Sequence, residues 1–200
     1  MAISTPPRGA EIERTTGETT VRLRLGLDGA GESNARTGVG FLDHMLDLLA
    51  RHARFDLDVE ATGDLETGSH HTTEDVGIVL GRALDEALGD RAGVNRYGDA
   101  TVPMDEALAA CAIDLSGRPY LAFEGAIPAT TIGNFETELA EEFFRAVAAN
   151  ARLTAHLRLL AGTNAHHMVE ACFKSFARAL RAAVAVDPAD TAVPSTKGVL

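Results

Sequence analysis

The amino-acid sequence predicts an α+β fold made by tandem duplication of one α/β unit, with two sheets and paired helices. The first observation is that HARFDLDVE at 52–60 aligns with NARLTAHLR at 150–158, an offset of 98. The second is that HHTTEDVGIVLGRAL at 70–84 aligns with HHMVEACFKSFARAL at 166–180, an offset of 96. The third is that the expected strands and helices follow the same order in both halves, as an internal repeat requires.

Individual elements follow from hydrophobic periodicity and from turn residues. Alternation of apolar and polar residues predicts half-buried strands, and apolar residues at helical spacing predict helices. In the first half we expect a strand at 21–25, a turn at 28–31 and a helix at 41–51. A strand at 55–59, a helix at 72–88 and a junction at 90–97 should follow. In the second half we expect extended segments at 107–115 and 119–126 and a helix at 136–150. A strand at 153–160 and a long helix at 167–186 should follow.

The chain is expected to divide into four parts. A flexible arm that contains proline and glycine covers 1–10, and the first α/β half covers 11–92. The second half covers 93–186, and an irregular, substrate-binding tail with two prolines covers 187–200. Proline and glycine interrupt regular elements, which favours irregular structure at both ends.

Composition narrows the possible partners of this 200-residue chain. The formal net charge of -11 argues against a nucleic-acid surface, which requires a basic patch, but a few cations can still attract a small anion locally. No run of about 18 apolar residues occurs, so we expect no membrane span. The N-terminus lacks an apolar signal region. Cys111 and Cys172 form no CxxC pattern, so we expect reduced thiols and a cytoplasmic protein.

The repeated HHxxE motif indicates a metal site. His70 and Glu74 are four residues apart and share one face of a helix, whereas His71 points about 100° away. His166, His167 and Glu170 repeat this arrangement. A single HH pair is more often surface or helix-capping chemistry, but its repetition at equivalent places favours metal binding. Imidazole with carboxylate suits Mn, Fe, Ni or Zn, and the motif is not the HExxH signature of zinc proteases.

Pseudo-twofold pairing of the halves predicts two ions, each bound by residues of both halves. The offset of 98 places His44 opposite Glu142 as an additional ligand position in each half. One ion would take four ligands: His70, Glu74, His167 and Glu142. The other would take His166, Glu170, His71 and His44. Whether the halves that share an ion belong to one chain or to two subunits stays open.

A few cationic and hydroxyl groups are candidates for binding a phosphate. Arg96 lies in NRYG, and Arg118 lies in the turn SGRPY. Ser195 and Lys197 lie in the terminal STKG, where hydroxyl, ammonium and backbone N–H donors combine. Lys174 follows His166 by two helical turns on nearly the same face and is expected to reach the metal site.

These segments together resemble the imidazoleglycerol-phosphate dehydratase family. The segments that carry the resemblance are FLDHMLDLLARH, ATGDLETGSHHTTEDV, GVNRYGDATVPMDEAL, DLSGRPY, AGTNAHHMVEACFKSFARALR and PSTKGVL, and they span nearly the whole chain after the arm. The resemblance implies a duplicated fold of the ribosomal protein S5 domain 2-like type. It also implies a homo-oligomer, with 24 subunits in the best-known case, and active sites between subunits.

The resemblance further implies two Mn²⁺ ions per active site and a set of site residues. One ion is expected on His44, His71, His166 and Glu170, and the other on His70, Glu74 and His167. The family usually has His where this chain has Glu142, and we expect Glu142 to bind metal in its place. The substrate contacts implied are Glu18, Arg96, Arg118, Lys174, Ser195 and Lys197. The catalytic residues implied are Glu18, His71 and Glu170, with Glu18 as the candidate for proton transfer.

The reaction that the resemblance implies is dehydration of imidazole glycerol phosphate to imidazole acetol phosphate in histidine biosynthesis. The carbon that loses its proton is not next to a carbonyl group, so that proton is not acidic. Metal coordination of the ring favours imidazolate, which can expel the hydroxyl group to give a diazafulvene, followed by an enol and then the ketone. A general acid and a general base must assist.

Two other classes of function remain open at this point. A di-metal hydrolase or oxygenase uses similar ligands but does not account for a phosphate-bearing substrate of imidazole size. A metal-storage or sensing protein does not need the SGRPY and STKG segments.

Overall fold

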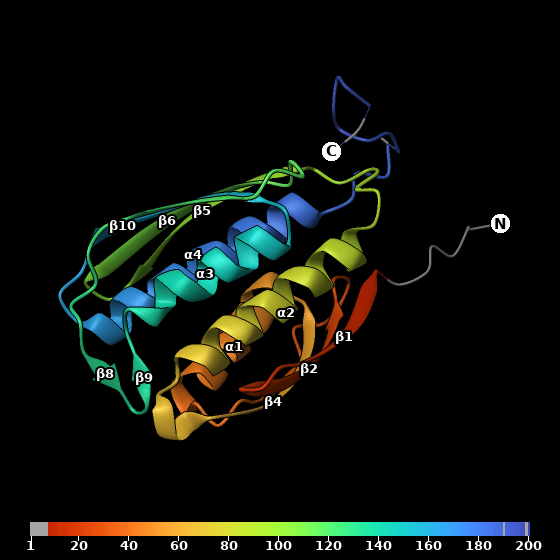
Figure 1. Cartoon of the computed structure of the whole chain (residues 1–200). Coiled ribbons are helices and arrows are strands. Elements are labelled where there is room, and N and C mark those ends of the chain that lie inside the picture. Colours follow the sequence, from red (N-terminus) through yellow and green to blue (C-terminus); the bar gives the residue numbers. More distant parts are fainter. Residues whose placement is uncertain (1–7, 190, 199) are drawn as a thin grey trace.

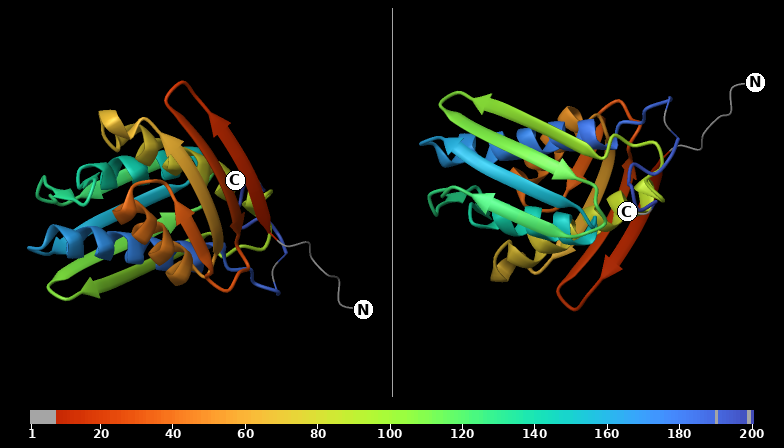
Figure 2. Two further views of the ribbon diagram at one scale, coloured as in Figure 1. Left: turned by 90° about the horizontal axis from the view of Figure 1, so that it is seen from below. Right: turned by 90° about the horizontal axis from the view of Figure 1, so that it is seen from above.

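A computed structural model describes residues 8–189, 191–198 and 200. The described chain forms four layers: two sheets lie on the outside and four helices lie between them (Figure 1). Views from below and above show each sheet covering its own pair of helices (Figure 2). This α+β arrangement of two four-stranded sheets confirms the predicted fold class.

The first half contains four strands, two α-helices and one turn of 3-10 helix. They are β1 (Gly9–Thr15), β2 (Thr19–Gly26), β3 (Ser33–Arg36), α1 (Gly40–Ala53), β4 (Asp56–Gly63), η1 (Leu65–Thr67) and α2 (His70–Leu88). The second half adds a small two-stranded hairpin to the same plan. Its elements are β5 (Tyr97–Met104), β6 (Ala107–Asp114), β7 (Tyr120–Glu124), β8 (Thr131–Ile132), β9 (Phe135–Glu136), α3 (Leu139–Asn150), β10 (Thr154–Ala161) and α4 (Ala165–Val184).

The topology of the two sheets demonstrates the duplication. The strand orders are β1-β2-β4-β3 and β5-β6-β10-β7, so in each half the fourth strand lies between the second and the third. The third strand runs parallel to the fourth in both sheets, and the other pairings are antiparallel. The strands β4 and β10 begin at Asp56 and Thr154, which reproduces the sequence offset of 98.

The buried core lies between the sheets and the helices. In β2, Val21, Leu23 and Leu25 are buried whereas Arg22 and Arg24 between them are exposed, the alternation of a sheet with one covered face. The helices α2 and α3 pack closely because α2 presents glycine to its neighbour. A Cβ atom at Gly81 would lie 2.7 Å from the carbonyl oxygen of Val147.

Several element boundaries differ from the sequence prediction. The segment 1–10 was expected to be an arm, but β1 begins at Gly9, and Arg8 hydrogen-bonds Asp28 and the carbonyl oxygen of Val184; residues 1–7 lie outside the described part of the chain. The helix expected over 136–150 begins at Leu139, because Phe135 and Glu136 belong to the β8–β9 hairpin.

The end of the last helix and the tail also differ in detail. The helix expected over 167–186 spans Ala165–Val184, and Val186 pairs with Val94 in an isolated bridge. The described part of the tail 187–200 has no helix or strand. Among the described helices, none is both long enough and apolar enough to cross a membrane.

Candidate metal centre and substrate site

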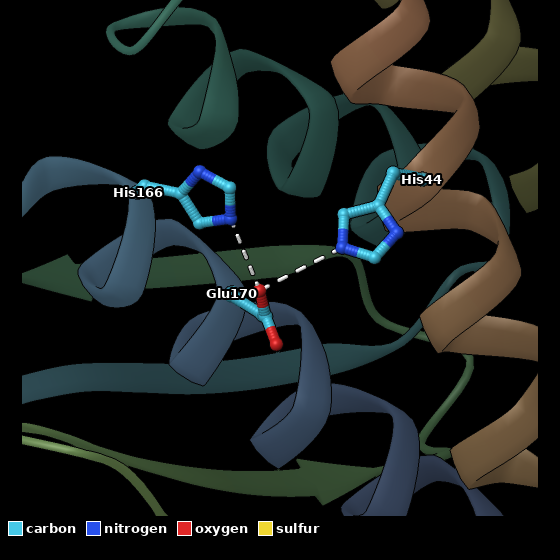
Figure 3. Close-up of side chains that lie close together, drawn as sticks. All are labelled: His44, His166 and Glu170. Carbon is cyan, nitrogen blue, oxygen red and sulfur yellow. Dashed lines mark ion pairs between the residues drawn. The ribbon is translucent and has the colours of Figure 1, made fainter.

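Three possible metal ligands meet where the two halves join. His44 extends from α1, and His166 and Glu170 extend from α4 (Figure 3). The Oε2 atom of Glu170 lies 3.3 Å from Nε2 of His166 and 3.7 Å from Nε2 of His44. One ligand atom from each residue lies within 4.8 Å of the others. His166 and Glu170 share a face of α4 because they lie four residues apart on this helix.

The chemistry of this triad fits a divalent metal. Two imidazole nitrogens and one carboxylate oxygen form a donor set suited to Mn, Fe, Ni or Zn. The side chains of His44 and His166 are 48% and 42% exposed, so an ion and a substrate can approach them from solvent. Glu170 is 8% exposed, and its carboxylate pairs with Lys174. Three ligands leave coordination positions open for another group.

Lys174 keeps the Glu170 carboxylate ionised. Its Nζ atom lies 2.5 Å from Oε1 of Glu170, one helical turn further along α4. Burial raises the pKa of Glu170, but the hydrogen bond and charge of Lys174, together with His44 and His166, lower it below its ordinary value. Lys174, expected near the metal site from its helical position, therefore lies against a ligand of the triad.

The second histidine of each HHxxE motif is held by a carboxylate. Nδ1 of His71 lies 3.0 Å from Oδ2 of Asp64, and its Nε2 lies 3.8 Å from Oε1 of Glu18. Nδ1 of His167 lies 2.7 Å from Oε2 of Glu106. The Asp64 hydrogen bond raises the pKa of His71, and the Glu106 hydrogen bond raises the pKa of His167. His167 in turn holds the pKa of Glu106 at about 2.

A single described chain brings together three of the four ligands expected for one ion. His71, the fourth, is engaged by Asp64 and is not a member of the triad. The ligands expected for the other ion form no comparable group within the described residues. Nε2 of His70 lies 4.0 Å from Glu74, and Glu142 lies 3.6 Å from Nε of Arg145.

Sequence reasoning did not identify Asp64 and Glu106. Asp64 lies seven residues before His71, directly after β4, and Glu106 lies in the turn between β5 and β6. Glu106 is 61 residues from His167 in the chain. For Asp64 the signal present is a carboxylate close upstream of HH. For Glu106 the signal is its place directly before the second strand of a hairpin, the place that Glu18 has in the first half.

The C-terminal tail lies over one end of the second sheet. Arg96 is 13% exposed, and its Nε and Nη1 atoms hydrogen-bond Asp114 (2.7 Å) and the carbonyl oxygen of Pro194 (2.8 Å). A Cβ atom at Gly117 would lie 2.5 Å from the carbonyl carbon of Leu200. The structure therefore places Arg96 and the turn at 116–118 against the tail.

The other candidate phosphate ligands belong to the same end of the molecule. Arg118 is 68% exposed and lies 3.9 Å from Asp114. In the tail, the N–H of Lys197 donates to Oγ of Ser195 (3.2 Å). Asp114 is hydrogen-bonded to Arg96 and close to Arg118, which links both arginines to one carboxylate.

Two outer sheets around four helices, with a cluster of two histidines and one glutamate at their junction, define a duplicated α+β protein with a metal-ligand centre. The model of the imidazoleglycerol-phosphate dehydratase family matches residues 37–180. The chain belongs to this family and is a hydro-lyase. The family reaction is a dehydration in histidine biosynthesis, and the family depends on metal.

Relatives agree along almost the whole chain. Imidazoleglycerol-phosphate dehydratase from Azorhizobium caulinodans is 60% identical over 194 residues, which cover 96% of this chain and 98% of the relative. The dehydratase from Acetivibrio thermocellus is 56% identical over 193 residues, which cover 96% of this chain and 99% of the relative. The crystal structure of the dehydratase from Staphylococcus aureus has a TM-score of 0.81 at 45% identity, covering 90% of this chain and 99% of that one. The crystal structure of the dehydratase from Pyrococcus furiosus has a TM-score of 0.82 at 39% identity, and the match covers 94% of this chain and 100% of that one.

Proposed function

We propose that this chain converts imidazole glycerol phosphate to imidazole acetol phosphate and water, with two Mn²⁺ ions in each active site. The observation that carries the proposal is the His44–His166–Glu170 triad, which joins the two halves of the chain. Its donor atoms suit Mn²⁺, and the family to which the chain belongs supports a dehydration. The elimination route expected from the sequence stays part of this proposal.

We assign the ligands as the motif spacing predicts. One ion would be held by the triad and His71, and the other by His70, Glu74, His167 and Glu142. The side chains of His70 and Glu74 are 57% and 47% exposed and face solvent in a single chain. Exposed, incomplete ligand sets support active sites shared between subunits. We therefore propose that neighbouring chains of a homo-oligomer complete each site. The resemblance to the family adds the proposal of 24 subunits, and the sequence composition adds that of a cytoplasmic location.

When bound, the ions would supply Lewis acidity, and the N–H group of an imidazole ring that binds metal through its other nitrogen would be easier to deprotonate. The chain's own residues then transfer protons and hold the substrate. Glu18, close to Nε2 of His71, moves a proton to or from the substrate. Arg118, Ser195 and Lys197 bind the phosphate and fix the orientation of the substrate.

Arg96 and Lys174 complete the proposed substrate site from less exposed positions. Arg96 contributes by holding the tail segment that carries Ser195 and Lys197. Lys174 keeps Glu170 ionised and offers a cationic group to the substrate. In this proposal His71 and Glu170 are catalytic as metal ligands.

The deciding experiment measures dehydration of imidazole glycerol phosphate by the metal-stripped chain before and after addition of Mn²⁺. We expect no product from the stripped chain and full activity after Mn²⁺ is restored. An inactive but folded and Mn²⁺-loaded chain would disprove the proposed function.

A further inference from the structure

The second histidine of each HHxxE motif is contacted by a carboxylate, and the two carboxylates come from different places in the two halves. In the first half, Asp64 approaches Nδ1 of His71 from the segment directly after β4. In the second half, Glu106 approaches Nδ1 of His167 from the β5–β6 turn. In both halves the carboxylate therefore contacts Nδ1 of the histidine and not Nε2.

Glu18 and Glu106 occupy equivalent positions in the two hairpins. Each directly precedes the second strand of its hairpin, since β2 begins at Thr19 and β6 begins at Ala107. Each also lies next to the second histidine of its half. Glu106 contacts Nδ1, however, whereas Glu18 lies on the Nε2 side of His71 at 3.8 Å.

The position equivalent to Asp64 explains this difference. A Cβ atom would meet Thr72 at Gly63 and Met168 at Gly162, and each of these two neighbours is the second residue after the first histidine of its motif. Gly63 and Gly162 therefore occupy equivalent places in the two halves.

The residue that corresponds to Asp64 is thus Thr163, which has no carboxylate. The N–H and Oγ1 groups of Thr163 donate instead to Oε1 of Glu106, and the hairpin glutamate takes over the contact with Nδ1 of His167.

Glu106 is itself well fixed. Its Oε1 atom accepts hydrogen bonds from the backbone N–H groups of Asn164 (2.8 Å) and Thr163 (3.1 Å), which leaves Oε2 for His167. Asp64 is fixed in a similar way, since its Oδ2 atom accepts a hydrogen bond from Oγ1 of Thr67 at 3.1 Å. A carboxylate held by its surroundings can fix the tautomer and the ring orientation of a histidine.

We propose that Asp64 and Glu106 are positioning residues that fix His71 and His167 with Nε2 directed to metal, and that Asp64 thereby leaves Glu18 free for proton transfer. This inference rests on the proposed function, because it concerns the ligands of the proposed ions. A carboxylate on the far nitrogen makes an imidazole a better ligand, and loss of such a partner typically weakens metal affinity by about 10- to 100-fold.

The test is calorimetric titration of the full-length, metal-stripped chain with Mn²⁺. The variants are Asp64→Ala and Glu106→Ala, the conservative Asp64→Asn and Glu106→Gln, and Glu66→Ala as the matched control. Glu66 is an exposed residue of η1, two positions from Asp64. We expect the alanine variants to bind Mn²⁺ about 10- to 100-fold more weakly. The amide variants keep an acceptor for Nδ1–H and should recover most of the affinity, and the control should match the wild type.

Rescue by the amide variants separates positioning from a general structural defect. A defect of folding alone weakens Mn²⁺ binding in the alanine and the amide variants alike, and thermal unfolding of each variant checks the fold.

Each outcome decides the matter. Wild-type affinity in both alanine variants, or amide variants as weak as the alanine ones, would overturn the positioning role while leaving the proposed function intact. A folded wild-type chain that binds no Mn²⁺ would overturn the proposed function and this inference with it.

Discussion

His44 and Glu170 face each other across the junction of the two halves, with Nε2 and Oε2 3.7 Å apart. One residue comes from α1 of the first half and the other from α4 of the second. The candidate metal centre is therefore a product of how the halves pack, and neither half contains it alone. Several consequences of this arrangement, and of the packing that supports it, can be measured.

Replacement of His44 by alanine should remove a ligand and leave the fold intact. The side chain of His44 is about half exposed, so its loss leaves no buried cavity. We expect fewer Mn²⁺ ions per subunit and loss of dehydratase activity, with an unchanged melting temperature of the metal-free chain. His156→Ala, an exposed histidine on the outer face of β10, is the matched control. An unchanged metal content in His44→Ala would contradict the assignment of the triad.

The role of Glu142 can be decided by counting metal. In a single chain this carboxylate lies near Arg145 and forms no cluster with His70 and Glu74. If it binds an ion at a subunit interface, Glu142→Ala should lower the Mn²⁺ content per subunit and the activity together. Glu141→Ala, the adjacent residue that pairs with the same arginine, should lower neither. Full stoichiometry and activity in Glu142→Ala would exclude it as a ligand.

The contact between α2 and α3 should not tolerate a methyl group at Gly81. A Cβ atom there would lie 2.7 Å from the oxygen of Val147 and 3.0 Å from the nitrogen of Ala151. Overpacking of this kind costs about 1–3 kcal/mol, more than the helix propensity that alanine gains over glycine, about 1 kcal/mol. Urea unfolding should show lower stability for Gly81→Ala. Gly40→Ala, where no atom lies within 4 Å of the new Cβ, should be neutral or slightly stabilising.

The ion pair between Arg8 and Asp28 should give a stability difference that depends on pH. The Arg8 hydrogen bond lowers the pKa of Asp28 below its ordinary value of 3.8. A carboxyl group whose pKa is lower in the folded state stabilises the fold above its unfolded pKa, and this contribution is lost as the pH falls through the folded pKa.

Asp28→Asn should therefore be less stable than the wild type at neutral pH, by less than about 1 kcal/mol because the Asp28 carboxylate is about half exposed. The difference should shrink once the pH falls below 3.8. Urea unfolding of the metal-free variants across this range measures it, with the exposed Asp47→Asn as control. A difference that stays constant with pH would show that Arg8 does not act through the Asp28 charge.

Sequence periodicity missed the two strands of the short β8–β9 hairpin and three strands of the larger sheets. These three, β1, β3 and β5, are all edge strands of their sheets. β1 has only one large apolar side chain, Ile12, and β3 (SNAR) has none. Edge strands bury little surface, so their sequences lack the contrast between faces that identifies β2 and β4. The duplication itself was visible because the repeated residues lie in buried helices and strands.

The proximity of the candidate metal ligands was easier to predict than that of the carboxylates that contact the neighbouring histidines. His166 and Glu170 are four residues apart on one helix, so their proximity follows from helical geometry alone. The position of His44 followed from the offset between the halves. Glu106 reaches His167 only through the pairing of β5 with β6, which brings a turn next to the start of a helix in the same half. No local pattern contains that information.

The difference between Asp64 and Thr163 has a consequence for how such a chain could arise. In a symmetric dimer of identical single halves, any residue after the fourth strand is present twice, so both copies must be aspartate or both must be threonine. Fusion into one polypeptide removes that constraint. Asp64 and Thr163 can then differ, and one hairpin glutamate can become a structural support while its counterpart stays available for chemistry. The covalent link between the halves is thus what permits a division of labour that a homodimer cannot encode.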